Sequence, residues 1–272
     1  MDPPLPPARN MAIDEAIAIA FAKNKTHLAE ATCPARVVPP TLRLYQWESP
    51  ALTLGSFQKI DPTLRQFLEA NPITPIRRIT GGQALLHDRD LTYSIIASTH
   101  DPLFLGGIKK TFYSIAQGLL AGLQTLGISA KIHIPMRDNP SRRSPFCVVS
   151  LSWYEIAVSG GEKLIGSAQK RWIDHFLQHG SLPLEPSPLE KSLYEKKSIT
   201  LSDLLNRLPS LSAIEEALKV GFETAWSIRL EKGDLTSKEN QLVDYLLAER
   251  YTNAAWTEER VPQNQSRILG LF

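Results

Sequence analysis

The sequence predicts an α+β fold, and three observations predict it. Short apolar runs typical of strands dominate the middle of the chain, whereas helical periodicity marks both ends. The hydrophobic fraction of 43% over 272 residues is enough for a buried core. No linker is long or biased enough to mark a second domain. We therefore expect one domain over residues 1–272, with a flexible proline-rich start at 1–9 and a helical part from about 189 to 272.

The helices are predicted from apolar periodicity and from their capping residues. The first begins with Asn10 as its N-cap, and Asp14 and Glu15 follow where the start of a helix favours negative charge. Further helices are expected at Asp61–Ala70, at Ile108–Leu126 before Gly127, and after the capping-box patterns Ser212–Glu215 and Thr236–Glu239.

The strands are predicted from short runs rich in apolar and β-branched residues. They are Leu42–Trp47, Ala51–Phe57, pieces of Ile76–Ala97, Ile128–Ile134, Trp153–Val158, Lys163–Ile173 and Phe176–Leu184. The glycine pair at 160–161 lies between two of these runs and predicts a hairpin. Residues 136–146 are polar and rich in proline and arginine, which indicates a loop.

Composition excludes several classes of protein. A net charge of +2 gives no general footprint for nucleic acid, and two cysteines exclude a disulfide framework and a four-cysteine zinc site. The apolar run Ala16–Ala22 is too short to span a bilayer, and acidic residues precede it where a secretory signal carries positive charge. We expect a cytoplasmic protein that binds neither membrane nor nucleic acid.

The densest cluster of unusual residues is Ile76–Asp88. Its paired glycines, Gly81 and Gly82, let backbone approach a ligand closely, and their N–H groups can converge on an anion or a carbonyl oxygen. The adjacent Arg77 and Arg78 supply fixed positive charge. The alternative is a hairpin turn with solvated arginines.

A second cluster begins at Lys163. The small residues Gly166, Ser167 and Ala168 leave room for a ligand to lie against the predicted strand, and Lys163 at its start could reach the bound group. The alternative is a solvated lysine beside a tight strand crossing.

Cys147 follows the polar loop and lies near Arg142 and Arg143, whose charge would favour the reactive thiolate. The alternative is a small buried apolar residue. His175 and His179 have the spacing of a helical metal pair, but the local pattern favours a strand and Phe176 stands where a zinc protease needs glutamate, so we expect no metal.

Together these clusters resemble the lipoate-protein ligase and octanoyltransferase family, whose catalytic domain is shared with biotin-protein ligases. The resemblance covers roughly residues 10–230. Its pieces, in order, are Asn10–Glu15, Leu44–Trp47, Thr53–Gln58, Arg77–Gly82, Leu86–Asp88, Leu91–Ser94, Lys163–Ala168 and Gln178–Ser181. The resemblance implies mixed, largely antiparallel sheets flanked by helices.

Within this family the sequence is most similar to the cysteine-dependent octanoyltransferases of Gram-positive bacteria. In that branch a cysteine precedes a Trp-Tyr-Glu sequence by six residues, as Cys147 precedes Trp153–Glu155 here. The ATP-using ligases lack this cysteine. Gln83 and Val148 depart from the family pattern at positions that concern the acyl or pantetheine contact.

The resemblance implies acyl transfer with Cys147 as nucleophile and Lys163 as the contact to the acyl carbonyl. It places Arg77, Arg78, Gly81 and Gly82 around the acyl group. Three further sets complete the expected substrate site: Thr80 and His87; Gly166, Ser167 and Ala168; and His179 and Gly180.

The implied partners are octanoyl-acyl carrier protein as donor, and lipoyl domains of 2-oxoacid dehydrogenases or the glycine-cleavage H protein as acceptors. No cofactor is expected. Three alternatives stay open: an ATP- and magnesium-dependent lipoate-protein ligase, an octanoyl amidotransferase between H protein and lipoyl domains, and a non-catalytic homologue that binds lipoyl domains.

Overall fold

The computed structural model describes residues 3–29, 39–134, 154–158, 160–193 and 198–260. Its strands are β1 Thr41–Tyr45, β2 Ala51–Leu54, β3 Thr74–Arg77, β4 Leu85–His87, β5 Asp90–Ser98, β6 Ala130–Ile132, β7 Ile156–Val158, β8 Lys163–Arg171 and β9 His175–Pro183. Its helices are α1 Pro7–Ala29, α2 Pro62–Ala70, α3 Ile108–Thr125, α4 Glu190–Leu193, α5 Leu201–Leu204, α6 Leu211–Trp226, α7 Ser237–Leu246, the π-helical turn η1 Leu247–Tyr251 and α8 Ala254–Glu259.

The strands form two sheets. Six strands pair in the order β1-β5-β9-β8-β7-β6, with every neighbour antiparallel. Three more pair in the order β3-β2-β4, where β2 runs parallel to β3 and antiparallel to β4. The predicted α+β class, with mixed and largely antiparallel sheets, is confirmed.

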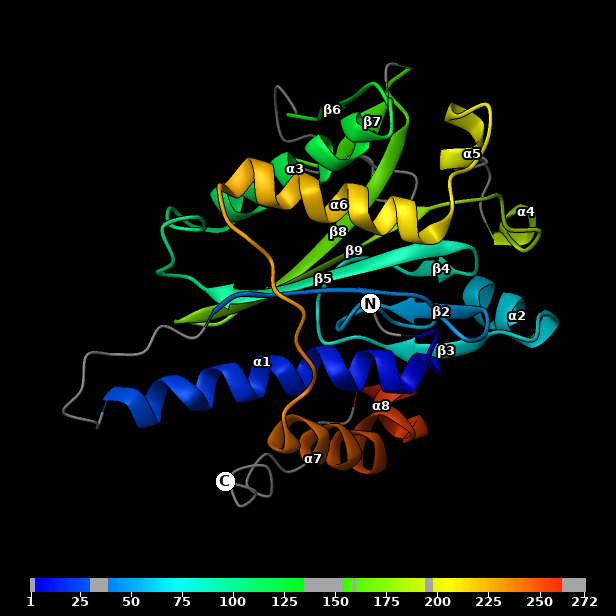
Figure 1. Cartoon of the computed structure of the whole chain (residues 1–272). Helices are drawn as coiled ribbons and strands as arrows, with labels where there is room; N and C mark the ends of the chain where they lie inside the picture. Colours follow the sequence, from blue (N-terminus) through cyan, green and yellow to red (C-terminus); the bar gives the residue numbers. More distant parts are fainter. Residues whose placement is uncertain (1–2, 30–38, 135–153, 159, 194–197, 261–272) are drawn as a thin grey trace.

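Helices cover both faces of the larger sheet (Figure 1): α1 and α7 lie on one side, and α3 and α6 on the other. All nine residues of β5 are buried, because its side chains alternate between two apolar cores. Ile95 belongs to the core with α3 and α6, and Ile96 to the core with α1 and α7. The smaller sheet packs on α2 through a third core that includes Leu52, Leu64 and Phe67.

Glycines allow α3 and α6 to pack closely. A Cβ atom on Gly221 would lie 2.2 Å from the backbone nitrogen of Gly122 and 2.6 Å from the carbonyl oxygen of Gly118. The ring of Phe222 fills the space over Gly118. The contact therefore depends on the absence of side chains at these positions.

Several predicted helix ends are confirmed. Asp61 accepts a hydrogen bond from the backbone N–H of Leu64 at 2.8 Å, with Pro62 next in the chain. Gly127 ends α3 with φ +78°, and Thr236 forms the predicted capping box with Glu239.

The start of α1 was predicted wrongly. The helix begins at Pro7, and Leu5 forms an isolated bridge with Trp47. Asn10 is not its N-cap, because its side-chain amide donates to the carbonyl oxygens of Leu5 and Gln46. This anchoring holds the helix against the chain that follows β1.

Two further capping predictions were wrong. Asp14 and Glu15 do not serve the first turn of α1, which contains no acidic residue; both are buried in ion pairs. The box predicted at Ser212 is absent, since Ser210 is the N-cap of α6 and accepts from the N–H of Ala213.

Candidate active site

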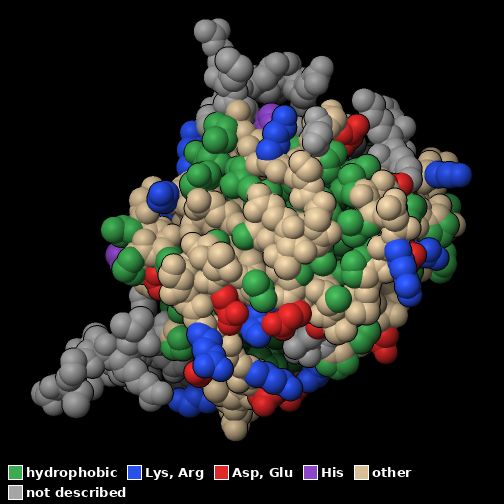
Figure 2. Space-filling model, turned by 45° about the horizontal axis from the view of Figure 1, so that its top comes forward, with side chains coloured by type: hydrophobic (Ala, Val, Ile, Leu, Met, Phe, Trp, Pro, Cys, Tyr) green, Lys and Arg blue, Asp and Glu red, His purple; other side chains and the backbone are tan. Residues whose placement is uncertain are grey.

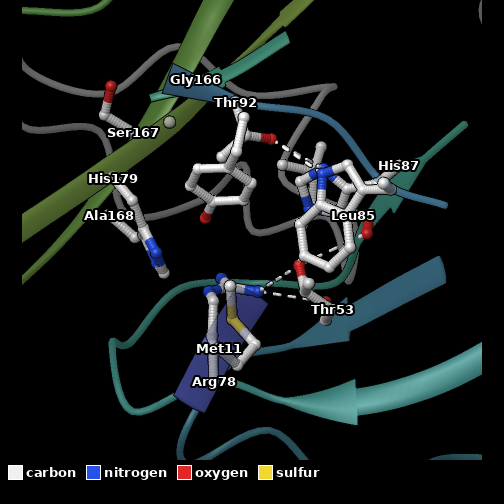
Figure 3. A pocket seen from close by; sticks show the side chains of 13 residues that line it. Met11, Thr53, Arg78, Leu85, His87, Thr92, Gly166, Ser167, Ala168 and His179 are labelled. Atoms are coloured by element: carbon white, nitrogen blue, oxygen red, sulfur yellow. Dashed lines mark hydrogen bonds between the residues drawn. The ribbon is translucent and has the colours of Figure 1, made fainter. Parts of the chain in front are cut away.

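A cavity open to solvent, with about 340 Å³ of empty space including that at its mouth, lies where the two sheets and the start of α1 meet (Figure 3). The larger sheet contributes small residues from β8 and β9, the smaller sheet contributes Thr53 and Leu85, and α1 contributes Met11. The lining residues are Met11, Tyr45, Trp47, Thr53, Arg78, Leu85, His87, Thr92, Gly166, Ser167, Ala168, His179 and Gly180. The site therefore combines residues that are distant in the sequence.

Arg78 is a fixed part of this wall. Its guanidinium donates to the carbonyl and hydroxyl oxygens of Thr53, to the hydroxyl of Thr80, and to the carbonyls of Gly81 and Gln83, at 2.9–3.1 Å. Figure 3 shows the bonds to Thr53. These contacts hold the charge in place at the boundary between the sheets.

The glycine pair shapes the loop that holds Arg78. Gly82 has φ +96°, a backbone conformation that favours glycine, and a Cβ there would lie 2.8 Å from the Nη2 atom of Arg78. A Cβ on Gly55 would lie 1.8 Å from the carbonyl oxygen of Gly82. Gly81 and Gly82 are not among the lining residues, so they act on the cavity through the position of Arg78.

His179 connects Arg78 to the buried carboxylate of Asp14. Its Nδ1 lies 3.3 Å from Asp14 Oδ2, and its Nε2 lies 2.7 Å from the Thr80 hydroxyl. Burial lowers the pKa of His179, which favours the neutral imidazole. Because the carboxylate only accepts, Nδ1 carries the proton and Thr80 donates to Nε2.

Asp14 is held ionised by the groups around it. Burial by itself would raise its pKa, but the hydrogen bond from His179 and the charge of Arg43 outweigh burial and lower it. Arg43 Nη1 lies 2.8 Å from Asp14 Oδ1, and the hydroxyls of Tyr45 and Ser94 also donate to this carboxylate.

A second network fixes His87 on the opposite wall. Its ring stacks on Trp47 with centroids 4.2 Å apart, and its Nδ1 lies 2.8 Å from Asp90 Oδ2. The same carboxylate oxygen accepts from the hydroxyls of Thr92 and Ser181 at 3.0 and 2.6 Å. The Nε2 atom of His87 lies 3.1 Å from the hydroxyl of Thr53, which also accepts from Arg78.

These networks show how polar residues can line the cavity while their donors and acceptors are paired within the protein. The polar groups bond to one another, as Ser167 does to the hydroxyl of Tyr93 at 2.6 Å. A methylene chain can lie against such a wall without separating a donor from its acceptor. Gly180 allows its neighbours to pack closely against β9, because a Cβ there would lie 2.6–2.7 Å from atoms of Gly166, Tyr93 and Ser167.

A second cavity, of about 300 Å³, shares Leu85 and Gly166 with the first. Its other lining residues are Lys163, Leu164, Ser181, Pro183 and Ser198. The Nζ atom of Lys163 lies 2.7 Å from Glu155 Oε1, and both side chains are buried. A paired ammonium therefore lies beside a space adjacent to the first cavity.

The structure brings together seven of the predicted substrate residues in the first cavity and Lys163 in the second; the seven are Arg78, His87, Gly166, Ser167, Ala168, His179 and Gly180. Thr80 lies behind them, bonded to Arg78 and His179. Cys147, Arg142 and Arg143 lie outside the described residues.

Arg77 is the predicted residue that the structure places elsewhere. Its guanidinium donates to carbonyl oxygens of Gly55 and Gln58 and to three carbonyls of α8, at Trp256, Thr257 and Glu258. Arg77 thus anchors the C-terminal helix and does not line either cavity, contrary to the expectation that it contacts substrate.

Sequence reasoning did not assign a site role to six residues that line the first cavity, which are Met11, Tyr45, Trp47, Thr53, Leu85 and Thr92. It also missed two buried carboxylates that pair with site residues, Asp14 and Glu155. Asp14 had a detectable signal, since it lies among the apolar residues of a helix face, where an acidic residue needs a partner. Glu155 had none beyond its place in a short Trp-Tyr-Glu sequence.

Within the described ranges, no group of three or more histidines, cysteines or acidic residues could hold a metal ion. No helix in that same part of the chain is long and apolar enough to cross a membrane.

Comparison with known proteins shows the family of this chain. The family model described as the lipoyl protein ligase A/B catalytic domain matches residues 6–223. The chain belongs to this family. Its relatives include proteins named octanoyltransferase LipM from Kyrpidia tusciae, 37% identical with 92% of this chain and 93% of that protein covered, and from Bacillus cereus, 33% identical with 93% and 95% covered.

Solved structures of the lipoyl protein ligase family share the fold. Lipoate-protein ligase A bound with ATP superposes with a TM-score of 0.72 at 22% identity, covering 92% of this chain and 93% of that one. A chain from the bi-partite lipoate protein ligase system of Thermoplasma acidophilum gives 0.72 at 21% identity, covering 96% and 97%.

Proposed function

We propose that this protein is a cysteine-dependent octanoyltransferase of protein lipoylation. It moves an octanoyl group from acyl carrier protein, through a thioester on Cys147, to a lysine of a lipoyl domain or of glycine-cleavage H protein. The names of the relatives at 33–37% identity support octanoyl transfer. The sequence position of Cys147 supports the thioester route.

The reaction proceeds in two balanced steps. The Cys147 thiolate attacks the carbonyl carbon of the donor thioester, a new C–S bond forms, and the carrier leaves as its thiolate. The ε-amine of the acceptor lysine then attacks the acyl-enzyme. An amide forms, the bond to Cys147 breaks, and the amine proton passes to the released thiolate. Because one thioester replaces another and the amide is more stable, neither step needs ATP.

The observation that best supports this route is that the two cavities are neighbours. Leu85 and Gly166 line both, so the buried Lys163 lies in the cavity next to the pocket between the sheets. An octanoyl chain in this pocket would bring its carbonyl towards Lys163, whose positive charge stabilises the oxyanion. Each buried methylene contributes about 0.8 kcal/mol to binding.

Because the net charge is only +2, electrostatic attraction of a protein partner would depend on local groups of charged residues. Lysines and arginines lie interspersed with acidic side chains on the face in Figure 2. Lys109 and Lys110 are exposed at the start of α3. We propose that both lysines face an acidic carrier protein, together with Arg142 and Arg143, which lie outside the described residues.

The test offers the protein three donors with one lipoyl-domain acceptor: octanoyl-acyl carrier protein without ATP, free octanoate with ATP and magnesium, and octanoylated H protein. We expect octanoylated acceptor from the first donor, and loss of that activity in the Cys147→Ala variant. Mass spectrometry of the acceptor measures the product.

Each other outcome contradicts the proposal in a different way. Transfer that needs ATP and survives Cys147→Ala indicates a ligase. Transfer from octanoylated H protein alone indicates an amidotransferase. Binding of the lipoyl domain with no transfer from any donor indicates a non-catalytic homologue.

A further inference from the structure

A buried carboxylate, Glu155, faces the lysine of the second cavity. The side chains of Glu155 and Lys163 are 2% and 7% exposed, and their charged atoms lie 2.7 Å apart. An isolated buried charge is costly, and a lysine side chain has four flexible carbons that do not fix its ammonium by themselves. The carboxylate compensates the buried positive charge, and it limits the positions that the flexible lysine side chain can take.

The residue before Glu155 has an unusual backbone conformation. The preceding residue, Tyr154, has φ +60°, which is uncommon for a residue that is not glycine. Two hydrogen bonds to His133 bracket this turn: the N–H of Tyr154 donates to the carbonyl of His133 at 2.8 Å, and the N–H of His133 donates to the carbonyl of Glu155 at 2.7 Å. Backbone held in such a conformation is frequent at functional sites.

The pairing of β7 with β8 is irregular at the same place. Ile156 pairs with Ile165, whereas the next residue, Ala157, pairs with Lys163, so β8 contains one extra residue. A bulge of this kind redirects the side chains beside it. Here it accompanies the placement of Lys163 at the second cavity.

The charge of Glu155 also reaches the first cavity. Burial is the main reason that the pKa of Tyr93 is raised to about 12, and Glu155 adds to the increase. Tyr93 bonds to Ser167 in the lining of that cavity. Glu155 thus lies close enough to affect Tyr93, which lies behind the lining residue Ser167.

We infer that Glu155 is a positioning residue, which holds the ammonium of Lys163 in the direction required to contact the acyl carbonyl. This inference rests on the proposed function, because it assumes that Lys163 acts on the acyl group. Glu155 itself touches no substrate in this scheme and acts only through Lys163.

The test compares four variants at the pair with a control. Glu155→Gln removes the charge while keeping the shape, and Glu155→Asp keeps the charge. Lys163→Ala and the double variant Glu155→Gln/Lys163→Ala complete a double-mutant cycle. Glu162→Gln is the matched control, because Glu162 lies in the same hairpin but is exposed. The readouts are kcat and KM for octanoyl transfer from acyl carrier protein, with the melting temperature to verify folding.

We expect Glu155→Gln to lower kcat at least tenfold with KM changed less than about twofold. Glu155→Asp should recover part of the loss, and Glu162→Gln should match the wild type. Adding Glu155→Gln to Lys163→Ala should cause no further loss, since Glu155 acts through the lysine.

Two results overturn the inference. One is a folded Glu155→Gln variant with wild-type kcat, which would show that the pair is structural only; the other is losses that multiply in the double variant. Both leave Lys163→Ala impaired. If Lys163→Ala is instead fully active, or the wild type transfers no octanoyl group, the proposed function itself fails.

Discussion

At the scale of single residues, Asp14 organises the centre of the molecule. One buried carboxylate accepts from Arg43, Tyr45, Ser94 and His179, which come from three strands of the larger sheet. Removing a partner from a buried ion pair typically costs 3–5 kcal/mol, because the remaining charge has no compensation. The position of His179 in the cavity wall therefore depends on a residue of α1.

His179 gives the folded protein a specific dependence on pH. Its pKa is lowered by burial, so the unfolded chain binds a proton at about pH 6.5 that the folded chain does not. The free energy of unfolding should therefore be highest above about pH 6.5 and decrease as the pH falls towards 5. Denaturant unfolding at a series of pH values measures this slope.

The variants His179→Gln and His100→Gln separate this contribution from that of other groups. His100 is exposed, so its variant should keep the wild-type slope between about pH 7 and 5. The slope of His179→Gln should be smaller. An unchanged slope in that variant would contradict a buried neutral imidazole.

The two adjacent arginines show what sequence reasoning can and cannot predict about single residues. Of the motif Arg77–Gly82, only Arg78 lines the first cavity. Successive residues of extended chain point in opposite directions, so one of the pair faces the cavity and the other the C-terminal helix. The sequence alone does not determine which, because that depends on how α8 packs.

At the scale of secondary structure elements, the contact between α3 and α6 depends most on small residues. Gly118 and Gly122 on α3 meet Gly221 and Phe222 on α6, and Trp226 donates from its ring to the carbonyl of Ser114. This pair of helices covers the core on one face of the sheet. The two helices therefore cover the face of the larger sheet that lies opposite α1.

Gly221→Ala should destabilise the protein although alanine favours a helix. The added Cβ would lie 2.2 Å from a backbone atom of Gly122, so the helices must move apart, at a cost of about 1–3 kcal/mol. Thermal unfolding measures the loss. Gly233→Ala, which meets nothing within 4 Å, is the control and should leave the melting temperature close to that of the wild type. A melting temperature in Gly221→Ala equal to that control would contradict the close contact.

Helix ends were predictable only where local chemistry decides them. The capping box of Thr236 and Glu239 needs just four residues, and it formed as predicted. The start of α1 depends on Leu5 meeting Trp47, a contact between segments far apart in sequence. Asn10 resembles an N-cap locally, but tertiary hydrogen bonds use its amide instead.

At the scale of the whole molecule, the candidate site forms where the two sheets and the start of α1 come together. The cavity is lined from α1, β1, β2, β4, β5, β8, β9 and the loops beside them. The sequence could indicate which short motifs belong to it, since most of the predicted substrate residues line the cavity. The sequence could not indicate the buried hydrogen-bond partners of the lining residues, because those are determined by packing between distant segments.

In the proposed reaction, Cys147 carries the acyl group between donor and acceptor. The most direct measurement is intact-protein mass spectrometry after incubation with octanoyl-acyl carrier protein, with neither acceptor nor ATP present. We expect one octanoyl group per chain, attached to Cys147, removed by hydroxylamine and transferred to a lipoyl domain when that is added. Absence of the adduct in a protein that still octanoylates its acceptor, or an adduct on another residue, would contradict it.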